Sequence, residues 1–166
     1  GDDAAAGPRP MTGAVPAALV ASLLSVVHGY TGYPVPIDPP AVILLPHAQL
    51  EAMACTHPCA VMGFAEPGGT IALDDTLRIG VDPADTSILV HELTHFLQRA
   101  AAHGAPAADC AAWLEREREA YDVQYRWLRD TAPNMREFSI RLARLGTHPM
   151  IPPCRPGQAA PADAPG

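Results

Sequence analysis

The chain has few aromatic residues, little positive charge and no long apolar run, and each shortage disfavours a class of protein. Only 5% of its 166 residues are aromatic whereas 19 are proline, which favours helices and loops over a β-sandwich. Eleven Lys and Arg against 18 Asp and Glu leave a net charge of −7. Nucleic acid and acidic membrane surfaces require a basic face, so neither is expected as a partner. No segment is long and apolar enough to predict a membrane span.

The length predicts one domain with a real hydrophobic core. We expect residues 1–13 to be disordered, residues 14–148 to form the domain, and residues 149–166 to form a proline-rich tail. The apolar run 14–27 lacks the flanking positive charge and the clear cleavage site of a signal peptide. We therefore interpret it as the first helix of the mature fold and expect that any leader has been trimmed.

Periodicity and turn residues predict an α+β fold with a small mixed or antiparallel sheet. Helix signals, including Asp82 as an N-cap and Gly29 and Gly104 as stops, mark five helices, at residues 16–28, 47–54, 83–103, 109–130 and 134–145. Strands are expected at residues 41–45, 60–65 and 70–74, after an extended linker over residues 31–40. The sequence Glu-Pro-Gly-Gly between the last two strands predicts a hairpin. Four arginines, Arg116, Arg118, Arg126 and Arg129, alternate with acids on the fourth helix and indicate a solvated face.

The four cysteines are compatible with two disulfides and therefore with an oxidising compartment, secreted or periplasmic. Cys55 and Cys59 flank a short loop that one bridge could close, and Cys110 would then pair with Cys154 and anchor the tail. The alternative is a metal site made by Cys55, His57 and Cys59, although this spacing is unusual for zinc.

The segment His-Glu-Leu-Thr-His at residues 91–95 carries the strongest chemical signal. Two histidines four residues apart lie on one helix face and can bind one ion, and Glu92 can reach a water on that ion. This is the HExxH pattern of zinc hydrolases, with His91 and His95 as ligands and Glu92 as general base. The alternative is a pair of core histidines hydrogen-bonded to the backbone.

Zinc in a catalytic site takes a third protein ligand and keeps a position for water. The following helix offers Glu115, Glu117 and Glu119. Glu117 falls in the middle of an apolar face, where a carboxylate must become neutral or find a cation, so it is the first candidate. Glu119 is the second. A Glu117 that simply pairs with an arginine remains an alternative.

The segment 91–95 followed by Glu117-Arg118-Glu119-Ala120-Tyr121 resembles the gluzincin clan of zinc metallopeptidases, in particular the single-lobe minigluzincins. The resemblance covers residues 60–130. It implies a zincin-like fold, with a sheet packed on the HExxH helix and the third ligand on a second long helix. It also implies an edge strand above the site, for which residues 70–74 are the candidate, where an extended peptide substrate pairs. Many gluzincins have an Asp at the position of Tyr121, so the second shell differs here.

We therefore expect a monomeric zinc metallopeptidase that acts on peptides or proteins with Zn²⁺ held by His91, His95 and Glu117. An oxyanion donor would complete it, and the candidates are Tyr121, Tyr125 and His148. Two other functions stay open: a secreted module that binds zinc without turnover, and a zinc hydrolase that acts on a non-peptide amide.

Overall fold

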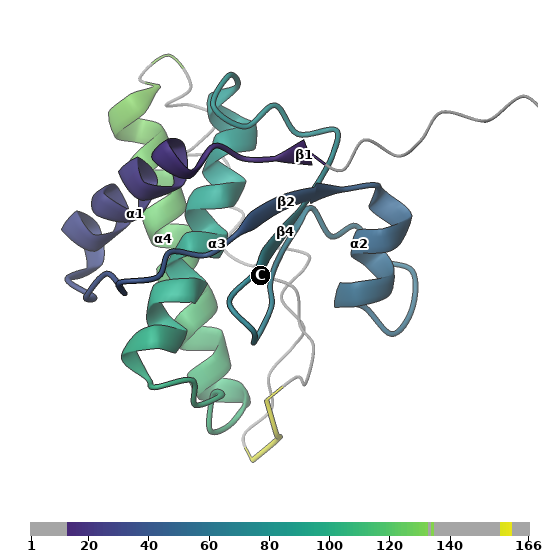
Figure 1. Ribbon diagram of the computed structural model, residues 1–166. Coiled ribbons are helices and arrows are strands. Elements are labelled where there is room, and N and C mark those ends of the chain that lie inside the picture. The colour runs from purple at the N-terminus through teal and green to yellow at the C-terminus, as the bar shows by residue number, and fades with distance from the viewer. Residues whose placement is uncertain (1–12, 133, 135–156, 161–166) are drawn as a thin grey trace, which may run out of the picture.

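The structure is a computed structural model that describes residues 13–132, 134 and 157–160. A small sheet separates two unequal helical layers (Figure 1). Helices α1 (Ala17–Thr31), α3 (Pro83–Ala101) and α4 (Cys110–Thr131) lie on one side of the sheet, and α2 (His47–Ala54) lies on the other. The predicted α+β class is confirmed. Three predicted features lie outside the described residues: the helix 134–145 except Asn134, His148, and the tail 149–166 except residues 157–160.

The sheet contains four strands in the order β1-β2-β4-β3. Their bounds are β1 Gly13–Ala14, β2 Val42–Leu45, β3 Gly63–Ala65 and β4 Ile71–Asp74. β2 and β4 are parallel, and the other two pairs are antiparallel, so the sheet is mixed. The hairpin predicted around residues 66–69 is confirmed, because the Glu66 N–H donates to the Thr70 carbonyl.

The prediction that residues 70–74 form an edge strand is wrong. β4 lies between β2 and β3, and its four residues are all buried. A buried run of Ile, Ala and Leu is what a central strand requires, whereas an edge strand can stay partly exposed. The edge beside α3 is instead β3, which is only three residues long.

Two elements near the N-terminus also differ from the sequence prediction. Gly13, placed in the disordered segment, pairs with Leu44 in the sheet. The helix predicted to stop at Gly29 continues to Thr31. Gly32 ends it in the left-handed conformation, with φ 76°, and donates its N–H to the His28 carbonyl. A glycine inside a helix costs only about 1 kcal/mol, so Gly29 is tolerated.

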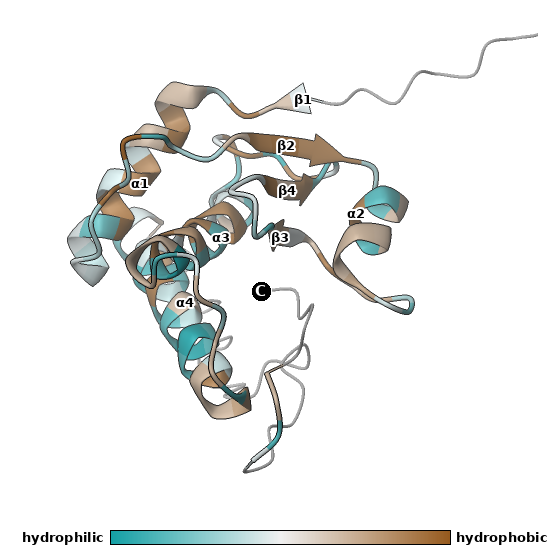
Figure 2. Cartoon of the chain, turned by 60° about the horizontal axis from the view of Figure 1, so that its bottom comes forward, coloured by the Kyte–Doolittle hydropathy of each residue, from teal (hydrophilic) through white to brown (hydrophobic). Residues whose placement is uncertain are grey.

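Successive residues of β4 point to opposite faces of the sheet and belong to two separate hydrophobic clusters. Ile71 and Leu73 face the large helical layer, and Ala72 between them faces α2. Figure 2 shows the strands as largely hydrophobic, while the outer face of α4 is hydrophilic. In the part of the chain that the structure describes, no helix is both long and apolar enough to cross a membrane.

The N-cap predicted for α3 is confirmed. The Asp82 side chain accepts hydrogen bonds from the N–H groups of Ala84 and Asp85, with Pro83 at the first helical position. The Asp109 side chain accepts from the Ala112 N–H. α3 and α4 run antiparallel, as four contacts in opposite order show: Ser87 with Gln124, His91 with Tyr121, His95 with Glu117, and Gln98 with Arg116.

Cys55 and Cys59 form a disulfide, as predicted. Their sulfurs are therefore not thiolates, which excludes the alternative metal site with His57. Cys110 is also disulfide-bonded. The partner predicted for it, Cys154, lies outside the described residues.

Candidate metal centre

Three ligand atoms from the two antiparallel helices converge at one point. Nε2 of His95 lies 3.0 Å from Nε2 of His91 and 3.1 Å from Oε1 of Glu117. Nε2 of His91 lies 3.5 Å from Oε2 of the same carboxylate. The structure thus brings together the two histidines and the first-choice glutamate.

These spacings fit a zinc ion. Metal bonds of about 2.0–2.1 Å in a tetrahedron place neighbouring ligand atoms about 3.3 Å apart, close to the three observed distances. The side chains of His91 and Glu117 are both 3% exposed, so charge gathered here is largely shielded from water. An N, N, O donor set of this kind suits zinc, although other divalent transition metals accept it too.

Glu119, the second candidate, has a different role. Its Oε2 accepts hydrogen bonds from the Tyr33 hydroxyl and from Nε2 of Gln98, each at 2.8 Å. It is not one of the three clustered ligands. The two glutamates are two residues apart on α4, so they leave the helix in different directions. The choice of Glu117 by helix face therefore agrees with the geometry.

Glu92 follows His91 on α3 and is fully buried. The Ala65 backbone lies near enough to favour its ionised form, but neither carboxylate oxygen forms a hydrogen bond of good geometry among the described residues. Burial raises the pKa of Glu92 to about 8. An unsatisfied carboxyl in this position is costly for the fold and is typical of a group kept for proton transfer.

The edge strand β3 crosses directly over this carboxyl. A Cβ atom at Gly63 would lie 2.8 Å from Oε1 of Glu92 and 2.9 Å from its Cγ. Glycine therefore allows the strand to approach Glu92 closely. Nothing in the sequence around Gly63 predicts this close approach, beyond its place in a short strand.

Without a metal, the centre is held by an ion pair. Although burial opposes both shifts, Glu117 raises the pKa of His95, and His95 is the main group that lowers the pKa of Glu117 to about 2. Burial lowers the pKa of His91 to about 4, so that ring is neutral at pH 7. A divalent ion would replace the proton of His95 and satisfy all three ligands.

Gln98 fixes the orientation of the His95 ring. Its Nε2 donates to the Arg116 carbonyl at 2.9 Å and to Glu119, so its Oε1 must face His95. Oε1 lies 2.9 Å from Nδ1 of His95. An amide oxygen only accepts, hence Nδ1 carries the proton and donates it. Nε2 of His95 is then the metal-facing nitrogen.

A second glutamine lies next to His91. Nε2 of Gln124 donates to Oγ of Ser87 at 2.9 Å, while the Ser87 hydroxyl donates to the Ala84 carbonyl. The other amide atom, Oε1 of Gln124, and Nδ1 of His91 are both buried and have no hydrogen-bond partner among the described residues. Burial is the main influence on the His91 pKa, and the Gln124 amide is among the groups that raise it.

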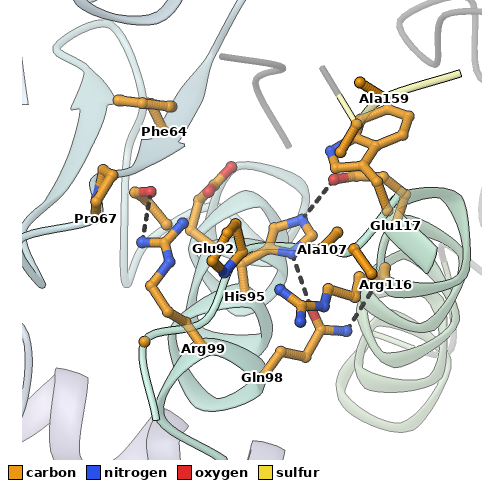
Figure 3. Close-up of a pocket in the computed structure, with 16 residues that line it drawn as sticks. Phe64, Pro67, Glu92, His95, Gln98, Arg99, Ala107, Arg116, Glu117 and Ala159 are labelled. Atoms are coloured by element: carbon orange, nitrogen blue, oxygen red, sulfur yellow. Dashed lines mark hydrogen bonds and ion pairs between the residues drawn. The ribbon is translucent and has the colours of Figure 1, made fainter. Parts of the chain in front are cut away.

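A pocket of about 590 Å³ opens onto the centre (Figure 3). Glu92, His95 and Glu117 lie on its wall, with Phe64 from the edge strand on one side and Trp113 from α4 on the other. Arg99 and Arg116 line the same pocket. Arg116, which was predicted to lie on a solvated face of α4, is partly exposed on the wall of this open pocket.

Tyr121 packs on His91, with ring centroids 4.4 Å apart. Burial, followed by Glu117, raises its pKa above the ordinary value of 10.0, so its hydroxyl is protonated. It is not among the described residues that line the pocket, and Tyr125 lies behind it with ring centroids 6.0 Å apart. Its predicted role as an oxyanion donor stays a prediction.

Comparison of the chain with protein-family models, curated proteins and solved structures found no match.

Proposed function

We propose that the protein is a zinc-dependent peptidase of the gluzincin kind, with His91, His95 and Glu117 as metal ligands and Glu92 as general base. One observation carries the proposal: three clustered ligand atoms lie beside a buried carboxyl that has no hydrogen-bond partner among the described residues, and Glu92, His95 and Glu117 all line one open pocket. A purely structural histidine pair would have no use for this fourth group.

The residues divide the chemistry as follows. Zinc, when bound, supplies a Lewis acid that polarises the substrate carbonyl and makes water more acidic. Glu92 takes a proton from the attacking water and returns it to the leaving amine. The pocket admits the substrate, and its apolar wall at Phe64 and Trp113 excludes water.

The edge strand β3 supports a peptide as the substrate. β3 pairs with β4 on one side only, and it approaches Glu92 at Gly63. An extended peptide that adds to the free side of β3 would bring a backbone carbonyl near the centre. β3 would therefore be the edge strand that pairs with the substrate, a role that the resemblance had suggested for residues 70–74.

The disulfide between Cys55 and Cys59 is typical of proteins from oxidising compartments. We therefore place the protein outside the cytosol, secreted or periplasmic. We expect it to act as a monomer, because the ligands and the base come from one chain.

The test has two parts. Metal analysis of the purified protein should find one zinc per chain, and Glu117→Ala should lose it. A peptide-library digest should show cleavage that a chelator abolishes and zinc restores. Glu92→Gln should keep the zinc and lose the cleavage; full turnover by that variant would refute the mechanism. Zinc binding without any cleavage by the wild type would indicate a binding module or a hydrolase of a non-peptide amide.

A further inference from the structure

Two arginines, Arg99 and Arg116, lie on the wall of the pocket. Arg99 follows His95 by four residues on α3, and Arg116 precedes Glu117 on α4, so each ligand helix contributes one. Neither guanidinium forms an ion pair with a carboxylate in the ranges that the structure describes. Figure 3 shows the two side chains on opposite sides of His95.

The hydrogen bonds of these arginines leave much of their binding capacity unused. Nη1 of Arg99 donates to the carbonyls of Ala65 and Glu66, at 3.0 and 2.5 Å, which ties α3 to the end of β3. Nη1 of Arg116 donates to the Ala105 carbonyl at 3.3 Å. All three acceptors are neutral, so these bonds position the cations without neutralising their charge.

The charged residues of the pocket indicate that it would bind an anion. Its charged lining residues are Glu92, Glu117, Arg99 and Arg116, besides His95. With a divalent ion bound, Glu117 and, when it is ionised, Glu92 offset at most the two charges of the ion, so at least two positive charges remain. Burial, and after it the neighbouring Arg116, lowers the pKa of Arg99, although the nearby Glu92 opposes this shift.

We propose that Arg99 and Arg116 form an anion subsite that selects peptides with a carboxylate close to the scissile bond. This rests on the proposed peptidase function. A carboxylate fits because a guanidinium binds it through two parallel hydrogen bonds. Residues four apart on a helix are about 5–6 Å from each other, and an extended peptide advances about 3.3 Å per residue. The carboxylate therefore belongs one or two residues from the scissile bond, on an Asp or Glu side chain or at the peptide C-terminus.

The test measures binding without turnover, on the full-length, zinc-loaded Glu92→Gln variant. The probes are short fluorescent peptides in matched pairs. In one pair, an acetylated and amidated alanine-rich peptide carries a single Glu or the isosteric Gln. In the other, an alanine-rich peptide ends in a free carboxylate or an amide. Together the two pairs distinguish a side-chain carboxylate from a terminal one.

We expect at least one carboxylate peptide to bind about tenfold or more tightly than its neutral twin, since hydrogen bonds between charged groups are worth that much. Arg116→Gln and Arg99→Gln should each remove most of the preference. Arg99→Lys keeps the charge and should restore part of it, which separates the subsite from any folding role of Arg99. Arg118→Gln, an exposed arginine on the same helix, removes the same charge and should change nothing.

Equal binding of the twins, no measurable binding of either, or a preference that survives both arginine variants would overturn the subsite. A cleavage assay on the wild type tests the proposed peptidase function independently of the binding assay, which tests the subsite. A carboxylate preference in binding with no cleavage would keep the subsite and reject the peptidase. Cleavage of both twins with equal kcat/KM, together with equal binding, would keep the peptidase and reject the subsite.

Discussion

Oε1 of Gln98 lies 2.9 Å from Nδ1 of His95, one turn along the same helix. The glutamine cannot be flipped, because its Nε2 already donates to the Arg116 carbonyl and to Glu119. The bond holds the His95 ring with its lone pair on the nitrogen that faces His91 and Glu117. In the proposed zinc site, a neutral amide would thus take the orienting role that carboxylates often have.

Gln98→Leu should weaken zinc binding by about 10- to 100-fold, the usual cost of losing a group that orients a ligand. Zinc affinity is measured by competition with a chromophoric chelator. Gln49→Leu makes the same change at an exposed position on α2 and serves as the control. Unchanged affinity in a folded Gln98→Leu protein would show that His95 needs no such support.

Gln124 should support His91 in the same way. Its amide is fixed by Ser87, so its unpaired Oε1 is the group that can accept the Nδ1 proton of His91. We expect ¹⁵N NMR of the metal-free protein near pH 7 to show His91 as the neutral Nδ1–H tautomer. Gln124→Leu should let the other tautomer appear and should reduce zinc affinity by about tenfold. A wild-type spectrum with the proton on Nε2 would contradict this arrangement.

The close approach of Gly63 to Glu92 gives a third prediction. In Gly63→Ala, the new methyl group would overlap the Glu92 side chain, whose carboxylate must then move. We expect the variant to keep its zinc and to lose hydrolysis by about 100-fold or more, because general-base catalysis contributes that much. Zinc stoichiometry and cleavage of one reporter peptide check the two parts.

Gly68→Ala is the matched control for this variant. Gly68 lies in the turn of the same hairpin, and a Cβ atom there would meet no atom within 4 Å. Its activity and melting temperature should stay close to those of the wild type. Normal hydrolysis by Gly63→Ala would show that Glu92 tolerates displacement and is not the base.

The sequence was sufficient for those parts of the site that depend on local pattern. The spacing of His91 and His95 needs only the geometry of one helix, and Asp82 is a sufficient N-cap signal. Glu117 was identified because a carboxylate on an apolar face needs a cation. Each of these inferences uses residues within a few turns of one another.

The remaining features depend on pairings between distant segments. The edge position of β3 follows from the parallel pairing of β2 with β4, which a hairpin signal cannot reveal. The approach of Gln124 to His91 depends on the register of two antiparallel helices. The place of Arg116 on the pocket wall was missed because alternating charges along α4 are also typical of a solvated face. Only the tertiary structure distinguishes these cases.

A fourth prediction concerns stability and lies on the other side of the sheet. Nδ1 of His47 at the start of α2 lies 2.8 Å from Oδ2 of Asp74 at the end of β4. The hydrogen bond with Asp74 raises the pKa of His47 above its ordinary 6.5. Although burial opposes the shift, hydrogen bonds with Thr76 and then His47 hold the pKa of Asp74 below its ordinary 3.8.

Together, the pKa shifts of His47 and Asp74 define the pH range in which the pair stabilises the folded protein. A raised histidine pKa contributes stability that is complete below 6.5 and is lost as the pH rises through the raised value. A lowered aspartate pKa contributes stability that is complete above 3.8 and is lost as the pH falls through the lowered value. The pair therefore stabilises the protein most between these limits.

We expect the difference in melting temperature between wild type and His47→Ala to be largest at pH 4–6.5 and to shrink above pH 7. His57→Ala, which removes an exposed histidine from the disulfide loop, should show no such pattern, and a difference that is constant from pH 5 to 9 would mean that the pair does not titrate with folding.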